Sequence, residues 1–137
     1  MKQHTGVITL GVRDMNRAKK FYGEGLGWKV HHESQGYWLS FSLNNGTLEF
    51  GLTPWDALAG DAGATPDGSG FRGITLSYVV RSPKRVDEVL EEAKRAGGTI
   101  ARPAKDMHGY YSGYFADPEG YLWKVVTGPG MEALAAE

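Results

Sequence analysis

The tripeptide Ile8-Thr9-Leu10 occurs again as Ile74-Thr75-Leu76, and the offset of 66 positions (74 − 8 = 66) is close to half of the 137-residue chain. Each copy begins the same succession of elements: an alternating strand, a capped amphipathic helix and further strands. A repeat of this kind sets the architecture of a chain, so it constrains the fold more than any single motif does. The sequence therefore predicts an α+β fold, one domain built from two βαβββ modules.

Changes in composition mark the ends of the modules. Module one is expected over about residues 5–53, and module two over about residues 73–127. Residues 54–72 are rich in Pro, Gly, Ala and Asp and have no sustained period, which indicates a linker with one helical turn near residues 55–58. Residues 128–137 are expected to be a tail, frayed or partly helical.

Both helices have clear start signals. Asp14 is expected to cap a helix with Met15, Ala18, Phe21 and Tyr22 on its apolar stripe. Ser82 followed by proline is expected to begin the second helix. The expected strands cover residues 7–12, 28–33, 37–43, 47–53, 73–78, 99–102, 110–116 and 121–127.

Composition excludes several classes of protein. The net charge is −1, from 15 basic and 16 acidic residues, and no basic stripe or polybasic segment favours nucleic acid or an anionic membrane. The absence of cysteine excludes disulfides, thiolate metal sites and cysteine nucleophiles. No signal peptide or bilayer-spanning apolar run is recognisable. We therefore expect a cytoplasmic protein that binds neither nucleic acid nor membrane.

Several motifs together resemble the vicinal oxygen chelate superfamily, which includes glyoxalase I, extradiol dioxygenases, fosfomycin resistance enzymes and bleomycin resistance proteins. The matching segments are residues 8–14, Phe21-Tyr22, residues 26–28 and the run from Phe115 to Tyr121. Their order and spacing agree over nearly the whole chain outside the linker and tail. The resemblance implies an eight-stranded cup made by the two modules, with the helices outside and the ligand site on the concave face.

The resemblance then indicates which face of each strand packs against the helices and which face lines the cup. The residues expected under the helices are apolar: Ile8, Leu10, Val12, Leu48, Phe50, Leu52, Ile74, Leu76, Trp123 and Val125. The residues expected to line the cup are small or polar: Val7, Thr9, Trp38, Ser40, Glu49, Gly51, Gly73, Thr75, Ser77 and Lys124.

The resemblance places the metal-binding positions of the superfamily at Val7, Glu49, Gly73 and Lys124. Only Glu49 carries a ligand for a divalent cation, because a charged lysine has no free lone pair. A catalytic metal site normally needs about three protein ligands. The sequence therefore predicts that the inherited metal site is lost and that no cofactor is bound; the alternative is a divalent metal at a rearranged site.

The histidines are not expected to replace the missing ligands. His31 and His32 are adjacent on a strand, so they should point to opposite faces and should not chelate together. His4, near the N-terminus, and His108, on a glycine-flanked loop, are expected to be solvated. A constellation of His4, Glu49 and His108 is the weaker alternative.

Glu49 and Lys124 occupy equivalent strands, so the pseudo-twofold axis implied by the resemblance would bring them together across the cup. Lys124 could then anchor an anionic ligand beside Glu49, or the pair could only fill the vacated metal site. Aromatic side chains, Trp38 and Tyr111 among them, could form an apolar wall. The predicted ligand-binding residues are Thr9, Trp38, Glu49, Thr75, Tyr111 and Lys124.

These features favour a homodimeric protein that binds a small organic molecule in a metal-free concave pocket, as the bleomycin resistance branch does. Bleomycin itself is not expected, because it is strongly cationic and this chain is nearly neutral. The alternative is a lyase, isomerase or dioxygenase of the glyoxalase type, using a rearranged metal site or Glu49 and Lys124 as general acid and base.

A third possibility is a protein-interaction module with a vestigial cup. The sequence leaves open the ligand, turnover, and whether the cup forms within one chain or by exchange of modules in a dimer.

Overall fold

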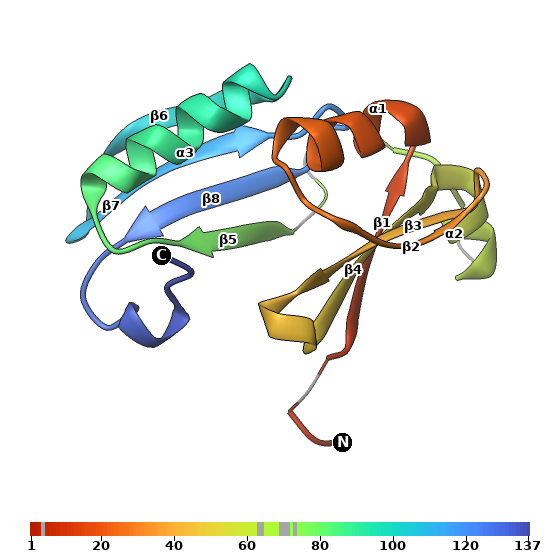
Figure 1. Ribbon diagram of the computed structural model, residues 1–137, viewed down its shortest axis with the longest axis horizontal. Helices are drawn as coiled ribbons and strands as arrows, with labels where there is room; N and C mark the ends of the chain where they lie inside the picture. Colours follow the sequence, from red (N-terminus) through yellow and green to blue (C-terminus); the bar gives the residue numbers. More distant parts are fainter. Residues whose placement is uncertain (4, 63–64, 69–71, 73) are drawn as a thin grey trace. The chain divides into compact units, whose positions relative to one another are not determined.

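The computed structural model describes residues 1–3, 5–62, 65–68, 72 and 74–137. The chain divides into two compact units, Met1–Gly68 and Ser69–Glu137. Each unit contains one four-stranded sheet, and each sheet has the same sequential arrangement of strands and helix (Figure 1). The predicted α+β fold and the βαβββ repeat are confirmed.

The sheet of the first unit has its first and last strands side by side at one end. Its strands are β1 (Val7–Val12), β2 (Val30–Ser34), β3 (Trp38–Leu43) and β4 (Leu48–Pro54). Their order is β1-β4-β3-β2, with β1 parallel to β4 and the other neighbours antiparallel. The strand β2 therefore lies at an edge of the sheet.

A two-part helix supplies the core of this unit. Helix α1 (Met15–Lys19) is capped by the Asp14 carboxylate, which accepts a hydrogen bond from the Arg17 N–H at 2.9 Å. It continues into the π-helical turn η1 (Lys20–Gly25), which ends where the Leu26 N–H donates to the Phe21 carbonyl. In the predicted apolar stripe, Ala18, Phe21 and Tyr22 are buried and Met15 is half-buried. The two aromatic members of the stripe, Phe21 and Tyr22, pack edge to face with ring centroids 4.9 Å apart.

A second helix lies in the segment expected to be the linker. Helix α2 (Trp55–Asp61) confirms the helical turn predicted there and is longer than expected. It packs against β1 and β4. A methyl group on Gly11 of β1 would lie 3.2 Å from the Trp55 Cα, so the missing side chain permits this close approach.

The second unit repeats the arrangement around one long helix. Its strands are β5 (Thr75–Val79), β6 (Thr99–Met107), β7 (Tyr110–Ala116) and β8 (Leu122–Thr127), in the order β5-β8-β7-β6. Helix α3 (Pro83–Arg95) begins at Ser82, whose hydroxyl accepts from the Arg85 N–H, and it buries Val86, Leu90 and Ala93 against β6, β7 and β8. None of the helices in the described ranges is long and apolar enough to cross a membrane.

The strand ranges agree with expectation to within two residues, with one exception. Strand β6 was expected to end at Arg102 but continues to Met107. Pro103 lies where the register against β7 shifts, between Arg102 and Lys105, which is how a strand accommodates a proline that cannot donate to the ladder. Ile74 was expected under a helix but precedes β5 and is 43% exposed, and Gly73 lies outside the described residues.

The C-terminal tail is anchored rather than frayed. After the 3₁₀ turn η3 (Glu132–Leu134), the Ala136 N–H donates to the Val79 carbonyl, and the Arg81 N–H donates to the Glu137 carbonyl. The Glu137 carboxylate also accepts from the Arg85 guanidinium and from the Tyr78 hydroxyl. Burial and the bond to Glu137 raise the pKa of Tyr78 to about 12.

Replacing Glu137 with glutamine is expected to lower the free energy of unfolding at neutral pH by about 1 kcal/mol or less, because the pair with Arg85 is partly exposed. The Arg85 hydrogen bond lowers the pKa of Glu137 from its usual 4.5, so the stabilisation is present above that pH and disappears as acid protonates the carboxylate. Urea unfolding of the parent chain and the Glu137→Gln variant should therefore differ at neutral pH and converge in acid. Glu132→Gln, in the same tail, is the control; an equal loss there would contradict a specific role for Glu137.

Candidate functional site

The polar side chains of the first unit share one face of its sheet. The register pairs Thr9 with Gly51, Gly51 with Ser40, and Ser40 with His32, so one row crosses all four strands. Directly paired residues lie on the same face of a sheet. The indole of Trp38 covers this row, because a methyl group on Gly51 would lie only 2.0 Å from the Trp38 Cη2. The predicted common face of Thr9, Trp38 and Ser40 is confirmed.

A β-bulge brings both histidines of β2 onto this face. Val30 pairs with Phe41 and His32 pairs with Ser40, so two steps along β2 match one step along β3 and His31 is the extra residue. The two imidazole centroids are 4.1 Å apart. The prediction that His31 and His32 point to opposite faces is wrong, because strict alternation fails at a bulge.

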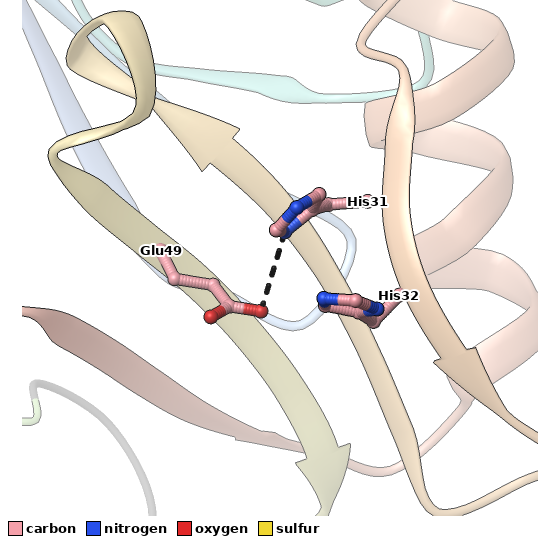
Figure 2. Close-up of side chains that lie close together, drawn as sticks. All are labelled: His31, His32 and Glu49. Carbon is pink, nitrogen blue, oxygen red and sulfur yellow. Dashed lines mark ion pairs between the residues drawn. The ribbon is translucent and has the colours of Figure 1, made fainter.

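The two imidazoles and the carboxylate of Glu49 form a cluster, which we call the His-His-Glu cluster. Their potential ligand atoms all lie within 4.8 Å of one another, and His31 Nδ1 is 3.7 Å from Glu49 Oε1. Figure 2 shows the three side chains converging over β3, the histidines from β2 and Glu49 from β4. The side chain of His31 is 48% exposed and that of Glu49 is 28% exposed, so solvent reaches the cluster.

Neighbouring groups keep Glu49 ionised. The Ser40 hydroxyl donates a hydrogen bond to Glu49 Oε1. This bond lowers the pKa of Glu49; partial burial opposes the shift, and the positive charge that His31 and His32 carry when protonated adds to it. The carboxylate is therefore a negatively charged acceptor over the ordinary pH range.

An open hollow of about 520 Å³ adjoins the cluster at His31. It lies where the ends of β2 and β3 meet the turn that follows β3. Its lining residues are Trp28, Lys29, Val30, His31, Phe41, Ser42, Leu43, Asn44 and Asn45. The lining combines aromatic, amide and hydroxyl groups.

The second unit carries cations at the corresponding place. The register pairs Arg102 with Tyr114, Tyr114 with Lys124, and Lys124 with Ser77, which gives one row across its four strands. The Arg102 guanidinium carbon lies 5.3 Å from the Tyr114 ring centroid, and Lys124 Nζ lies 5.9 Å from it. We call Ser77, Arg102, Tyr114 and Lys124 the cationic row. Thr75, two residues before Ser77, lies on the same face and is exposed.

Among the described residues, no acidic side chain pairs with the cations of this row. Within the part of the chain that the structure describes, no carboxylate lies within 4.0 Å of Lys124 Nζ or of the Arg102 guanidinium. Arg102 donates instead to the Ser112 hydroxyl at 2.8 Å and to the Pro103 carbonyl. The face therefore carries two cations over one aromatic ring.

Tyr111 lies away from the cationic row. Its hydroxyl donates to the Asp87 carboxylate of α3 at 2.8 Å, so its side chain lies on the helix-covered face of the sheet. Lys124 pairs with Tyr114, which is three residues from Tyr111 and therefore on the other face. The expectation that Tyr111 and Lys124 line one surface is wrong, because three steps along a strand reverse the direction of a side chain.

The remaining predicted site residues are the pair Glu49 and Lys124 and the histidines His4 and His108. Glu49 and Lys124 lie on equivalent strands of separate units, and their approach to each other stays a prediction. His4 lies outside the described residues. His108 and Gly109 form a two-residue turn between β6 and β7, with φ of 55° and 85°, and His108 is exposed there.

These two sheets, each with apolar residues under its helix and polar residues on the opposite face, are typical of the class built from paired βαβββ modules. The chain matches the family model of the Glyoxalase/Bleomycin resistance protein/Dioxygenase superfamily over residues 4–125. The chain belongs to this superfamily. The resemblance inferred from the sequence is therefore confirmed.

Solved structures agree with this assignment. A glyoxalase-related enzyme from Fulvimarina pelagi is 31% identical, with 93% of this chain and 90% of that chain covered and a TM-score of 0.83. A family enzyme from Burkholderia phytofirmans is 17% identical over 90% and 97% of the two chains, with a TM-score of 0.75. A lactoylglutathione lyase from Agrobacterium tumefaciens is 19% identical over 93% and 96%, with a TM-score of 0.69. The last two show the fold alone. No curated protein matches the chain.

Proposed function

We propose that the protein binds a small organic anion, aromatic in its best form, on the polar face of the second unit. The observation that supports this most directly is the cationic row. Lys124 and Arg102 both lie over the Tyr114 ring, and within the described ranges neither has a carboxylate within 4.0 Å. A small anion could accept hydrogen bonds from both cations, and an aromatic group on it could pack beside them.

This proposal needs no metal at the positions that the superfamily uses. Of the positions to which the resemblance points, Val7 and Lys124 provide no ligand for a cation and only Glu49 does. In the proposed role, Lys124 supplies the positive charge that the metal supplies elsewhere. Thr75 and Ser77 add hydroxyl groups on the same face.

The alternative is an enzyme of the glyoxalase type, a lyase, isomerase or dioxygenase. The glyoxalase-related enzyme at 31% identity makes an enzymatic role a reasonable second candidate. The His-His-Glu cluster favours it further, because it adds two metal ligands to Glu49. General acid and base chemistry by Glu49 and Lys124 would require the two units to bring them together.

The proposal is tested by a series of probes that share one ring and differ in charge: phenyl phosphate, benzoate, benzamide and benzylamine. We expect the two anions to raise the thermal unfolding midpoint in proportion to the logarithm of their concentration, and the amide and the amine to have no effect. In Lys124→Met the effect should fall at least about tenfold in apparent affinity, because one charge-assisted hydrogen bond is lost.

Lys94→Met is the matched control, since Lys94 is an exposed lysine at the end of α3. It should bind like the parent chain. Equal stabilisation by benzamide and benzoate, or undiminished binding by a folded Lys124→Met variant, would rule out the anion site.

We further propose that the chain is cytoplasmic and acts as a homodimer, as expected from the resemblance. Light scattering coupled to size exclusion measures the mass of the assembly against the 14.9 kDa of one chain. A monomer at all concentrations tested would exclude the dimer without affecting the binding proposal.

A further inference from the structure

We propose that the His-His-Glu cluster binds one divalent transition-metal ion, with zinc as the best-suited ion. The proposal concerns His31, His32 and Glu49 on the polar face of the first unit, and it does not rest on the anion site of the second unit. Two imidazole nitrogens and one carboxylate oxygen are the donors that zinc takes in catalytic sites with three protein ligands. Iron(II) accepts the same donor set with open positions.

The distances are close to those that an ion requires. Two ligands on a tetrahedral zinc ion, with bonds of about 2.1 Å, are about 3.4 Å apart. His31 Nδ1 and Glu49 Oε1 are 3.7 Å apart, and all the potential ligand atoms lie within 4.8 Å. Because both histidines are exposed and the carboxylate only partly buried, small side-chain rotations can close the remaining gap.

The bulge in β2 is the feature that makes the site possible. In a regular strand, His31 and His32 would lie on opposite faces, and only one could reach Glu49. The extra residue places both rings on the polar face, and β-bulges commonly re-aim side chains in this way. The strand β2 lies at the edge of the sheet, so the extra residue disturbs pairing on one side only.

A supporting residue orients the carboxylate. Metal-binding carboxylates are themselves hydrogen-bonded in most sites, and such partners hold the ligand in place. Ser40, fully buried on β3, donates its hydroxyl proton to Glu49 Oε1 and thus acts as a positioning residue. The same bond keeps Glu49 in the charged form that a cation requires.

The arrangement leaves coordination positions for another molecule. Three protein ligands leave a fourth position of zinc to water or to a ligand. The side chain of His31 is 48% exposed and lines the hollow of about 520 Å³. A small molecule with a carbonyl or hydroxyl oxygen could occupy the hollow and contact the ion. The site shares only Glu49 with the positions implied by the resemblance and takes both histidines from β2.

The test is isothermal titration calorimetry, in which zinc chloride is added to protein that carries no tag and has been treated with a chelator. We expect one ion to bind per chain. His31→Ala, His32→Ala and Glu49→Gln should each weaken binding by at least about tenfold, and Ser40→Ala should weaken it by a factor of about ten through the orientation of Glu49. Cobalt(II), followed by its visible absorption, should report the same stoichiometry and should compete with zinc.

His108→Asn is the matched control, because His108 is an exposed histidine in the other unit and asparagine tolerates its positive φ of 55°. It should bind zinc like the parent chain. The proposal is overturned if the parent shows no saturable binding, if binding survives both histidine substitutions, or if His108→Asn abolishes it. Circular dichroism of the metal-free variants separates loss of a ligand from loss of the fold. For a variant that unfolds, zinc-dependent shifts of the His31 and His32 ring protons in the parent decide the question instead.

Discussion

Replacing Phe50 with alanine is expected to lower the free energy of unfolding by about 3 to 5 kcal/mol, the range for deleting a buried aromatic ring. Phe50 is fully buried on β4, next to Glu49. Its ring centroid lies 5.2 Å from that of Tyr22 and 5.7 Å from that of Trp28. Strand β4, the turn η1 and the loop before β2 therefore lose packing at once. Urea unfolding monitored by tryptophan fluorescence measures the loss.

Tyr37→Ala is the control for this variant. Tyr37 is 72% exposed between β2 and β3, so its truncation should change stability by no more than about 0.5 kcal/mol. Similar losses for the two variants would mean that the aromatic cluster of the first unit is not the main source of its stability.

Replacing Gly113 with alanine is expected to destabilise the chain by about 1 to 3 kcal/mol, although it adds only one methyl group. That methyl group would lie 2.6 Å from Leu90 Cδ1 of α3 and 3.0 Å from the backbone nitrogen of Ala104 in β6. Leu90 can rotate, but the backbone of β6 can move only by disturbing its pairing with β7. Thermal or urea unfolding should show the loss.

Gly60→Ala is the matched control for overpacking. Gly60 lies in α2, and among the described residues beyond its chain neighbours and its own helix backbone, no heavy atom lies within 4 Å of the methyl group that alanine would add. Alanine is the better helix former, so this variant should be neutral or more stable by up to about 1 kcal/mol. Equal destabilisation of both variants would argue against a tight contact at Gly113.

The fold was largely predictable because its signals are local. The caps at Asp14 and Ser82 depend on a few neighbouring residues, and each lies where the sequence indicates. The apolar and polar faces follow from alternation, which held for Thr9, Ser40 and Lys124. The end of β6 was missed because pairing with β7, and not local propensity, extends the strand beyond Pro103.

The site was harder to predict, since it depends on register. Glu49 and Lys124 were singled out only because the resemblance places two metal-binding positions of the superfamily there. His31 and His32 were dismissed because a bulge cannot be read from alternation, and Arg102 was missed because its strand was expected to end there. The sequence did contain one signal for the His-His-Glu cluster. It places two adjacent histidines on a strand and a carboxylate on the same sheet.

The bulge in β2 also bears on how the site can arise and disappear. A single inserted residue in an edge strand rotates one side chain onto the other face and leaves the remaining ladder in register. Insertion or deletion of one codon there would therefore add or remove a metal ligand without rebuilding the fold. Among relatives of the same architecture, two adjacent histidines at this place are therefore expected to share a face only where the strand carries the bulge.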